Sequence, residues 1–205
     1  MDNFVITIAR GFGSGGKQIG LALSKQLGIP CYENQILSMA SNYSGINKDL
    51  FFQVDEKLRG YHLIKRLMKS ANKDDIVEPT DKSFISDVNL YNIQAKIIKE
   101  LAKQQSCIII GKCANHLLRD YDNTISVYIE APRAFCVKNV IERLGFTEEE
   151  AHRMIYQTSY FSRPCNNLRI YEGHKHGSRR VCDDRRIYNI CRSADIRKIL
   201  SRKHS

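Results

Sequence analysis

Residues 4–20 of this 205-residue chain read FVITIARGFGSGGKQIG, and this stretch decides the fold. Its first part, VITI at 5–8, is an alternating β-branched run that predicts a short buried strand. Glycines follow at positions 11, 13, 15 and 16, and Lys17 comes directly after them. Ile19, Leu23 and Leu27 then recur at helical spacing, so a helix is predicted after the glycines.

Strand, glycine-rich loop, lysine and helix, in this order, are typical of a phosphate-binding loop, or P-loop. Glycines let successive N–H groups curl around an anion, and the helix that follows points its own N–H groups and positive dipole end at the same place. A glycine-rich turn without a ligand is the structural alternative. We expect ATP phosphates to be bound by Gly11, Gly13, Ser14, Gly15, Gly16, Lys17 and Gln18.

One position departs from the P-loop pattern G-x-x-x-x-G-K-[ST]. Gly11, Gly16 and Lys17 match it, whereas Gln18 stands where Ser or Thr is expected. A glutamine amide is a poorer Mg²⁺ ligand than a hydroxyl in that position, so Mg²⁺ is expected to depend on substrate phosphates and water. No set of protein metal ligands is predicted.

Composition predicts one domain spanning 1–205, large enough for a proper core. Because no run approaches 18 apolar residues, no membrane span is expected, and the acidic N-terminus does not resemble a signal peptide. The seven cysteines are scattered and odd in number, which indicates reduced thiols and a cytoplasmic protein. The sequence does not predict the oligomeric state.

The net charge of +10 is concentrated at one end of the chain. Residues 158–205 carry 9 Arg and 3 Lys against 4 acidic residues, whereas residues 1–157 have a net charge of +2. Either a nucleic-acid-binding arm or an arginine-bearing lid over a polyphosphate fits this distribution. Nucleic acid is the weaker hypothesis, because no aromatic stacking platform accompanies the arginine pairs.

Helical and strand patterns alternate along the rest of the chain, which predicts parallel β-α units. Ligands of such sheets bind beyond the carboxyl ends of the strands, where the P-loop and Gly111-Lys112 both fall. Strands are expected at 31–32, 107–110 and 125–129, and a surface loop at 72–83. Helical segments are expected from an Asn34 cap to about Ser44, after Asn47, at 63–68, at 87–104, from Pro132 to Leu144, and from Thr147 to about 157. Thr147 as cap with Glu150 at the third helical position predicts a capping box at the start of the last of these helices.

Several segments together resemble the cytidylate kinase-like family of P-loop kinases. They are the stretch from ITIARGFGSGGKQIG to QIL at 6–37, SGI at 44–46, VDEKL at 54–58, CIIIGKCANHLLRD at 107–120 and GFTEEEAHRMI at 145–155. The resemblance covers about residues 4–157. It implies an α/β, three-layer P-loop NTPase fold with a mostly parallel sheet flanked by helices and a helical lid insertion. The core would be 1–157 and about 185–202, and the lid about 158–184.

The same resemblance implies ATP-dependent phosphoryl transfer to a nucleoside monophosphate, with CMP or dCMP as the named acceptors and Mg²⁺ as cofactor. Lys17 would neutralise charge during transfer, and Lys112, where the family usually has Arg, would face the acceptor phosphate. Glu33 would touch Mg²⁺ or the acceptor. Solvated surface positions are the alternatives for Lys112 and Glu33.

Lid arginines of nucleotide kinases close over the phosphates, and here Arg153 and Arg163 are the candidate catalytic arginines, with Arg169 a further one by location. Each could instead be a solvated surface residue. After about Thr158 the resemblance fails. A reading-frame disruption is one hypothesis; a divergent lid, with Arg185 and Arg186 supplying its charge and a final strand at 187–190, is the other.

A further hypothesis follows from these departures. The chain could bind nucleotides with little or no kinase turnover, because Gln18, Lys112 and the lid all depart from the family. A zinc site is not predicted, since the spacing of the candidate ligands matches no usual zinc knuckle. These candidates are Cys165, His174, His176, Cys182 and Cys191.

Overall fold

A five-stranded sheet organises the molecule, as the computed structural model shows for residues 3–57, 76–159 and 169–172. The spatial order is β2-β3-β1-β4-β5, and the first four strands are parallel, whereas β5 pairs antiparallel with β4. This confirms the predicted α/β fold with a mostly parallel sheet. The strands are β1 (Val5–Arg10), β2 (Cys31–Tyr32), β3 (Cys107–Ile110), β4 (Thr124–Ile129) and β5 (Arg169–Glu172).

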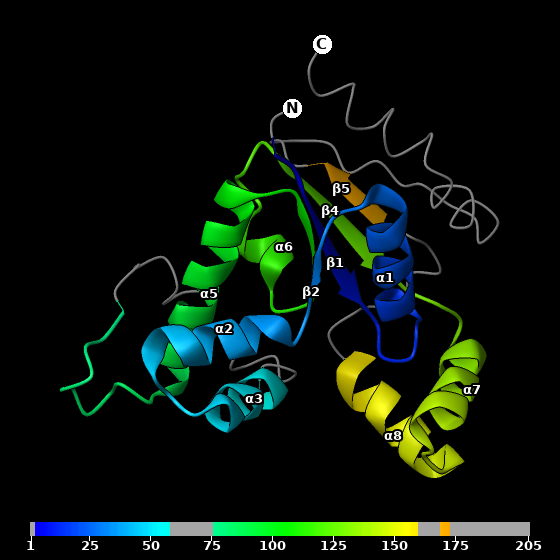
Figure 1. Cartoon of the computed structure of the whole chain (residues 1–205). Coiled ribbons are helices and arrows are strands. Elements are labelled where there is room, and N and C mark those ends of the chain that lie inside the picture. Colours follow the sequence, from blue (N-terminus) through cyan, green and yellow to red (C-terminus); the bar gives the residue numbers. More distant parts are fainter. Residues whose placement is uncertain (1–2, 58–75, 160–168, 173–205) are drawn as a thin grey trace.

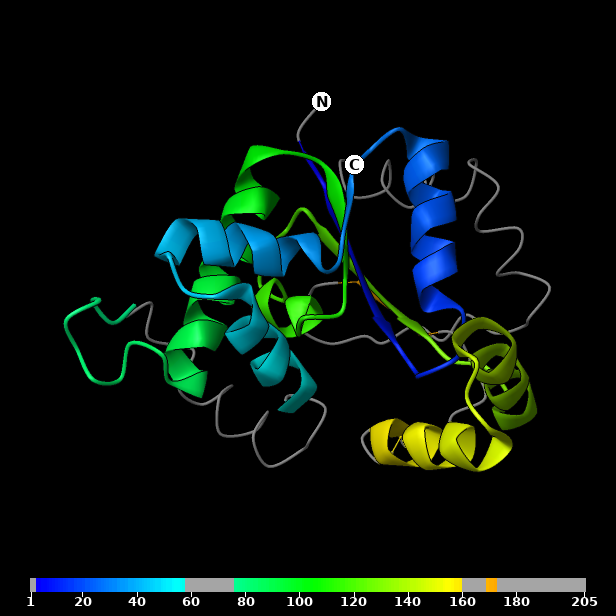
Figure 2. The same cartoon turned by 60° about the horizontal axis from the view of Figure 1, so that its bottom comes forward.

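Helices cover both faces of the sheet (Figures 1 and 2). Helix α1 lies on one face, and α5 and α6 lie on the other, together with α2 and α3. Helices α7 and α8 pack against each other near the end of the sheet where the glycine-rich loop lies. The helices are α1 (Gly16–Leu27), α2 (Gln35–Ser44), α3 (Lys48–Lys57), α5 (Asp87–Gln104), α6 (Ala114–Leu117), α7 (Arg133–Leu144) and α8 (Glu148–Ser159).

The two central strands divide their side chains between two cores. Val5, Cys107 and Ile109 belong to the core formed with α2, α3 and α5. Ile6 and Ile108, one position along each strand, belong to the core that contains Leu23 of α1. Because side chains alternate along a strand, a continuous apolar run such as CIII fills both faces of the sheet. The predicted three-layer arrangement is therefore confirmed.

Helix ends follow the local sequence in most places. Gly28, Gly45 and Gly145 end α1, α2 and α7 in the left-handed conformation that glycine adopts without cost. At the start of α8, the N–H of Thr147 donates to Glu150 Oε2 at 2.9 Å and the N–H of Glu150 donates to Thr147 Oγ1 at 3.3 Å. This is the capping box that the sequence predicts.

The side chain of Asn34 does not cap α2, contrary to the prediction. Asn34 has right-handed helical angles, whereas a capping residue needs an extended backbone to bring its side chain onto the helix N–H groups. Instead, the N–H of Glu33 donates to Gln35 Oε1 at 3.0 Å.

Strand β5 was not predicted, and it lies inside the range expected to form the lid. Its partner is β4, with Tyr128 opposite Arg169 and Ile125 opposite Glu172. Residues 76–83 form no helix or strand, in agreement with the predicted surface loop. The remaining expected lid, the helical pattern at 63–68, the zinc candidates and the strand expected at 187–190 lie outside the described residues.

Candidate active site

The loop between β1 and α1, which is the predicted P-loop, folds tightly on itself. Gly13 and Gly15 have left-handed backbones, with φ of 78° and 83°. Ser14 Oγ donates to the carbonyl of Gly11 at 2.8 Å, which closes the loop on itself. Asn139 Nδ2, from α7, donates to the carbonyl of Gly13 at 2.8 Å. The loop is therefore held from inside and from a neighbouring helix.

The amino end of α1 suits a phosphate. Gly15 is the N-cap of this helix, and no side chain caps it. The first N–H groups of an α-helix have no partner within the helix, and they carry the positive end of its dipole. A Cβ at Gly15 would meet no backbone atom within 4 Å, so the left-handed turn, rather than crowding, calls for glycine there. These residues fit the phosphates of ATP.

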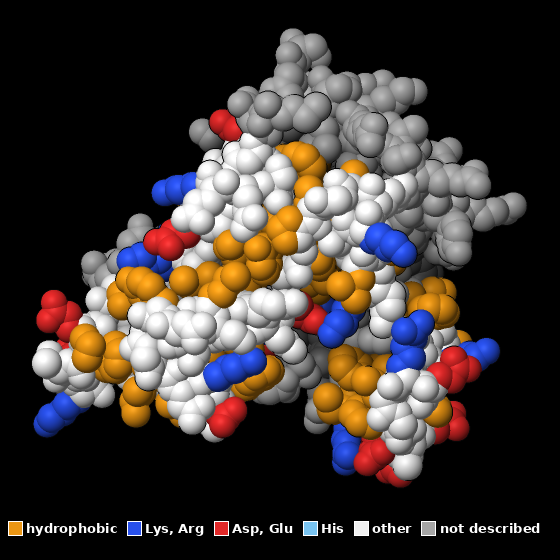
Figure 3. Space-filling model, in the orientation of Figure 1, with side chains coloured by type: hydrophobic (Ala, Val, Ile, Leu, Met, Phe, Trp, Pro, Cys, Tyr) orange, Lys and Arg blue, Asp and Glu red, His pale blue; other side chains and the backbone are white. Residues whose placement is uncertain are grey.

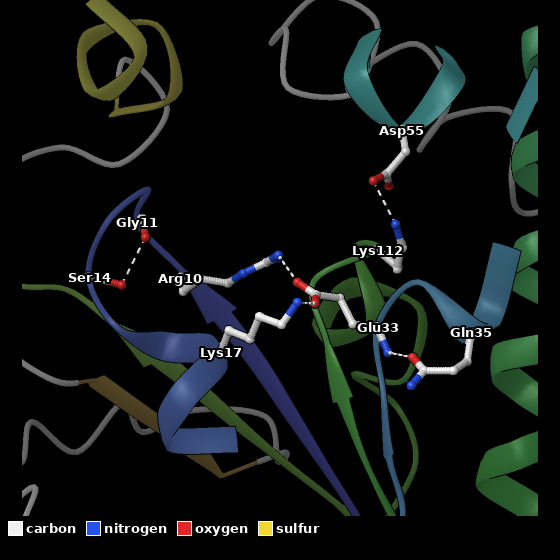
Figure 4. A network of polar contacts seen from close by, with 8 residues as sticks. All are labelled: Arg10, Gly11, Ser14, Lys17, Glu33, Gln35, Asp55 and Lys112. Atoms are coloured by element: carbon white, nitrogen blue, oxygen red, sulfur yellow. Dashed lines mark hydrogen bonds and ion pairs between the residues drawn. The ribbon is translucent and has the colours of Figure 1, made fainter. Parts of the chain in front are cut away.

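Lys17 does not point freely into solvent but shares a carboxylate with Arg10 (Figure 4). Lys17 Nζ lies 2.8 Å from Glu33 Oε2, and Arg10 Nη2 lies 2.8 Å from Glu33 Oε1. The Glu33 side chain is only 16% exposed. The reading of Glu33 as a solvated surface carboxylate is therefore wrong: it joins the first turn of α1 to the carboxyl ends of β1 and β2.

Gln18 is occupied by protein contacts. In the amide orientation that satisfies both neighbours, its nitrogen donates to the Gly15 carbonyl at 3.0 Å and its oxygen accepts from Arg143 Nη1 at 3.2 Å. The side chain thus braces the loop against α7. Since its oxygen already has a cationic partner, Gln18 does not fit a magnesium ligand.

Lys112 forms a second, more deeply buried ion pair. Its Nζ lies 2.6 Å from Asp55 Oδ2 of α3, and its side chain is 4% exposed. Burial lowers the pKa of Lys112, whereas the charge and hydrogen bond of Asp55 act in the opposite direction. The alternative of a solvated lysine is therefore wrong for Lys112.

The backbone around Lys112 is unusual. Gly111, Lys112 and Cys113 are consecutive left-handed residues, with φ of 72°, 56° and 54°. For the two that are not glycine, this conformation costs roughly 1–2 kcal/mol each. A side chain at Gly111 would collide with the guanidinium of Arg10. The turn after β3 is therefore packed against the turn after β1.

The two ion pairs lie at one end of the sheet (Figure 4). Arg10, Glu33 and Lys112 follow or end β1, β2 and β3, and both Arg10 and Glu33 act electrostatically on Lys112. Figure 3 shows the surface hollowed between the lobe of α2 and α3 and the lobe of α7 and α8. The structure thus brings the predicted P-loop, Glu33 and Lys112 together.

Of the two predicted catalytic arginines, only Arg153 is described, and it is not brought together with these residues. Arg153 is exposed on α8, and among the described residues no hydrogen bond or ion pair joins it to the P-loop. Arg163 lies outside the described residues, so both remain predictions. Sequence reasoning missed Arg10 and Asp55. The only signal for Asp55 was its place in VDEKL, and none singled out Arg10.

The described ranges contain neither a membrane-spanning helix nor a cluster of metal ligands. No helix in 3–57 or 76–159 is long and apolar enough to cross a membrane. In the same part of the chain, no three His, Cys, Asp or Glu side chains are grouped so that they could hold a metal ion.

Solved structures with a similar backbone have low sequence identity to this chain. An uncharacterized protein from Eubacterium ventriosum is 23% identical, with a TM-score of 0.49 over 77% of this chain and 72% of that one. TT1252 from Thermus thermophilus is 16% identical, with a TM-score of 0.41 over 75% and 79%. A gluconokinase from Sinorhizobium meliloti is 12% identical, with a TM-score of 0.39 over 75% and 74%. At these values none of the three bears on function.

Sequence comparison gives a clearer result. No curated protein is similar enough to the chain to count as a match. The sequence model of the cytidylate kinase-like family, by contrast, matches residues 5–191, which include the P-loop, Glu33 and Lys112. The chain therefore belongs to the cytidylate kinase-like family, and this membership supports nucleotide kinase activity in general.

Proposed function

We propose that this protein transfers the γ-phosphoryl group of ATP to a nucleoside monophosphate, with CMP or dCMP as the preferred acceptor. The observation that carries the proposal is the meeting of two lysines at one end of the sheet. Lys17 follows the glycine loop after β1, and Lys112 follows the neighbouring strand β3, with Glu33 acting on both. One cation serves the donor phosphates and the other the acceptor phosphate.

On the donor side, the uncapped N–H groups at the start of α1 and the loop at 11–16 would hold the ATP phosphates. Lys17 is 54% exposed, and its partner Glu33 also has Arg10, so Lys17 can leave this carboxylate for a phosphate oxygen. Bound Mg²⁺ would neutralise phosphate charge, held by phosphate oxygens and water. In such reactions the protein mainly positions the groups and stabilises charge.

On the acceptor side, Lys112 would bind the phosphate of the nucleoside monophosphate. Its ammonium is sequestered from water, which strengthens its interaction with an anion. Glu33 would orient Lys17 and contact the acceptor or its metal. Arg153 and Arg163 are proposed as lid residues that close over the phosphates and exclude water.

Nucleotides are the proposed partners, and the proposed location is the cytoplasm. The four cysteines of the described residues, Cys31, Cys107, Cys113 and Cys136, form no disulfide, which agrees with a reducing compartment.

A coupled assay of ADP release with CMP, dCMP, UMP and AMP tests the proposal. Lys17→Ala should lower kcat/KM by about a hundredfold or more, as loss of one charge-stabilising group does. Lys25→Ala is the matched control, since it removes an exposed lysine from the last turn of the same helix. Full activity of Lys17→Ala would refute the mechanism.

The second candidate is a nucleotide-binding protein with little turnover. Two observations favour it: Gln18 is engaged by Gly15 and Arg143, and Lys112 is already paired with Asp55. Calorimetry with Mg-ATP separates the candidates from each other. Binding of ATP without ADP release on any acceptor would favour this second function, and absence of ATP binding would exclude both.

A further inference from the structure

The Lys112–Asp55 pair joins parts of the chain that are 57 positions apart in sequence. Asp55 lies on α3, and Lys112 lies in the turn after β3, the strand that pairs with β1. Val54, next to Asp55, is buried in the same core as Ala114, which starts α6 after the turn. Helix α3, which packs in the core through Val54, thus holds the Asp55 carboxylate against Lys112.

A buried lysine without a partner loses its proton easily, because the low-polarity surroundings penalise its charged form. Lys112 is 4% exposed and Asp55 19% exposed, so water supplies little compensation. An ammonium that must bind a phosphate dianion has to remain charged at neutral pH. Asp55 Oδ2 provides the opposite charge 2.6 Å from Lys112 Nζ.

We propose that Asp55 is a positioning residue for the acceptor site, which keeps the buried Lys112 ammonium charged and in place until an acceptor phosphate binds it. This inference rests on the proposed function. It assigns a role in the reaction to Asp55 of the VDEKL stretch, whose Val54 packs in the core. The left-handed backbone at Lys112 and Cys113 is consistent with it, because a conformation of this kind persists where surrounding contacts enforce it.

The electrostatic surroundings of Lys112 fix the direction of the expected pH dependence. Burial lowers the pKa of Lys112, and the positive charge of Arg10 lowers it further. The negative charges of Asp55 and Glu33 raise it. Only the charged form binds phosphate, so acceptor affinity falls as the pH rises through the pKa of Lys112. Without Asp55 this pKa is lower, and the fall begins at lower pH. The groups that act on Lys112 come from α3, β1 and the segment after β2: Asp55, Arg10 and Glu33. Cys113 of its own turn is acted on by Lys112, and Tyr91 of α5 by Cys113.

The test measures KM for CMP and KM for ATP between pH 7 and 10, above the second ionisation of the phosphate. Asp55→Asn should move the alkaline rise of the CMP KM down by at least about one pH unit, which is about tenfold in KM at a fixed alkaline pH. KM for ATP, which reports Lys17, should change by less than about twofold. Glu142→Gln is the control, because it removes a carboxylate from an exposed pair with Lys138.

Adding Lys112→Arg to Asp55→Asn should abolish the shifted alkaline rise, since guanidinium stays charged throughout this range. A CMP KM profile for Asp55→Asn that equals the wild type would overturn the inference, as would a shifted rise that persists in the double variant. If Asp55→Asn does not fold, Lys112→Arg alone decides: it should lose the alkaline rise of the wild type, and keeping it would overturn the inference.

Failure of the proposed function gives a different result from failure of this inference. Wild-type protein that phosphorylates none of the four monophosphates refutes the function. In that case the affinity for CMP, measured by calorimetry over the same pH range, replaces KM. Wild-type turnover with an unchanged pH profile in Asp55→Asn refutes only the role of Asp55.

Discussion

Gly13 offers the sharpest test of how tertiary packing shapes the P-loop. A Cβ at this position would lie 2.7 Å from the carbonyl oxygen of Cys136 and 2.9 Å from Val140 Cγ2. The oxygen belongs to the backbone of α7 and cannot turn aside. The Gly13 φ of 78° is also left-handed. Gly13→Ala therefore combines backbone strain with a collision.

The chain contains a matched control for the strain alone. Gly28 has a φ of 67°, and a Cβ there would meet nothing within 4 Å. Gly28→Ala should lower the free energy of unfolding by roughly 1–2 kcal/mol, the cost of a left-handed residue. Gly13→Ala should add about 1–3 kcal/mol for overpacking against α7. It should also weaken ATP binding, because the loop must move away from Asn139.

Urea unfolding followed by circular dichroism gives the difference between the two variants, provided that the m-values stay equal. Calorimetry with Mg-ATP gives the second readout. Equal destabilisation by the two substitutions, with ATP affinity retained in Gly13→Ala, would refute the reasoning. It would mean that α7 does not press on the loop.

Three other expectations concern stability. Tyr91→Phe should leave the urea midpoint unchanged or raise it, since the buried Tyr91 hydroxyl has no hydrogen-bond partner among the described residues; a loss of stability above about 1 kcal/mol would contradict this. Thr147→Ala should lower the free energy of unfolding by about 1 kcal/mol, because it removes the cap of α8. In a Glu150→Ala background the same substitution should lower it by less, because the two side chains of the capping box act together. Burial raises the pKa of the Cys107 thiol to about 12 from 9.0. The stability that the protonated thiol contributes is therefore complete below pH 9 and falls as the pH rises toward 12. Over that range the free energy of unfolding should decline less steeply for Cys107→Ala than for the wild type.

The sequence alone determined the core of the fold, because the relevant signals are local. Glycines that must adopt left-handed turns, the helical spacing after Lys17 and the apolar run CIII each specify their element within a few residues. The capping box of Thr147 and Glu150 is equally local. These elements, and the P-loop that they form, could be predicted without knowledge of any distant contact.

Strand β5 shows where local signals fail. RIYE at 169–172 and RIYN at 186–189 have nearly the same sequence, so periodicity alone does not distinguish them. The structure shows 169–172 as a strand, and 186–189 lies outside the described residues. An antiparallel edge strand such as β5 is defined by its pairing with β4 and not by its own composition.

The state of the two lysines was decided only by tertiary structure. Lys17 and Lys112 each directly follow a glycine in the segment after a buried strand, and the local sequence does not distinguish their exposure. Yet Lys17 is 54% exposed and Lys112 4% exposed, because Asp55 and the helix α3 that carries it meet Lys112 alone. Burial and ion pairing depend on residues distant in sequence, so the fold, and not the local motif, determines which lysine is exposed to solvent.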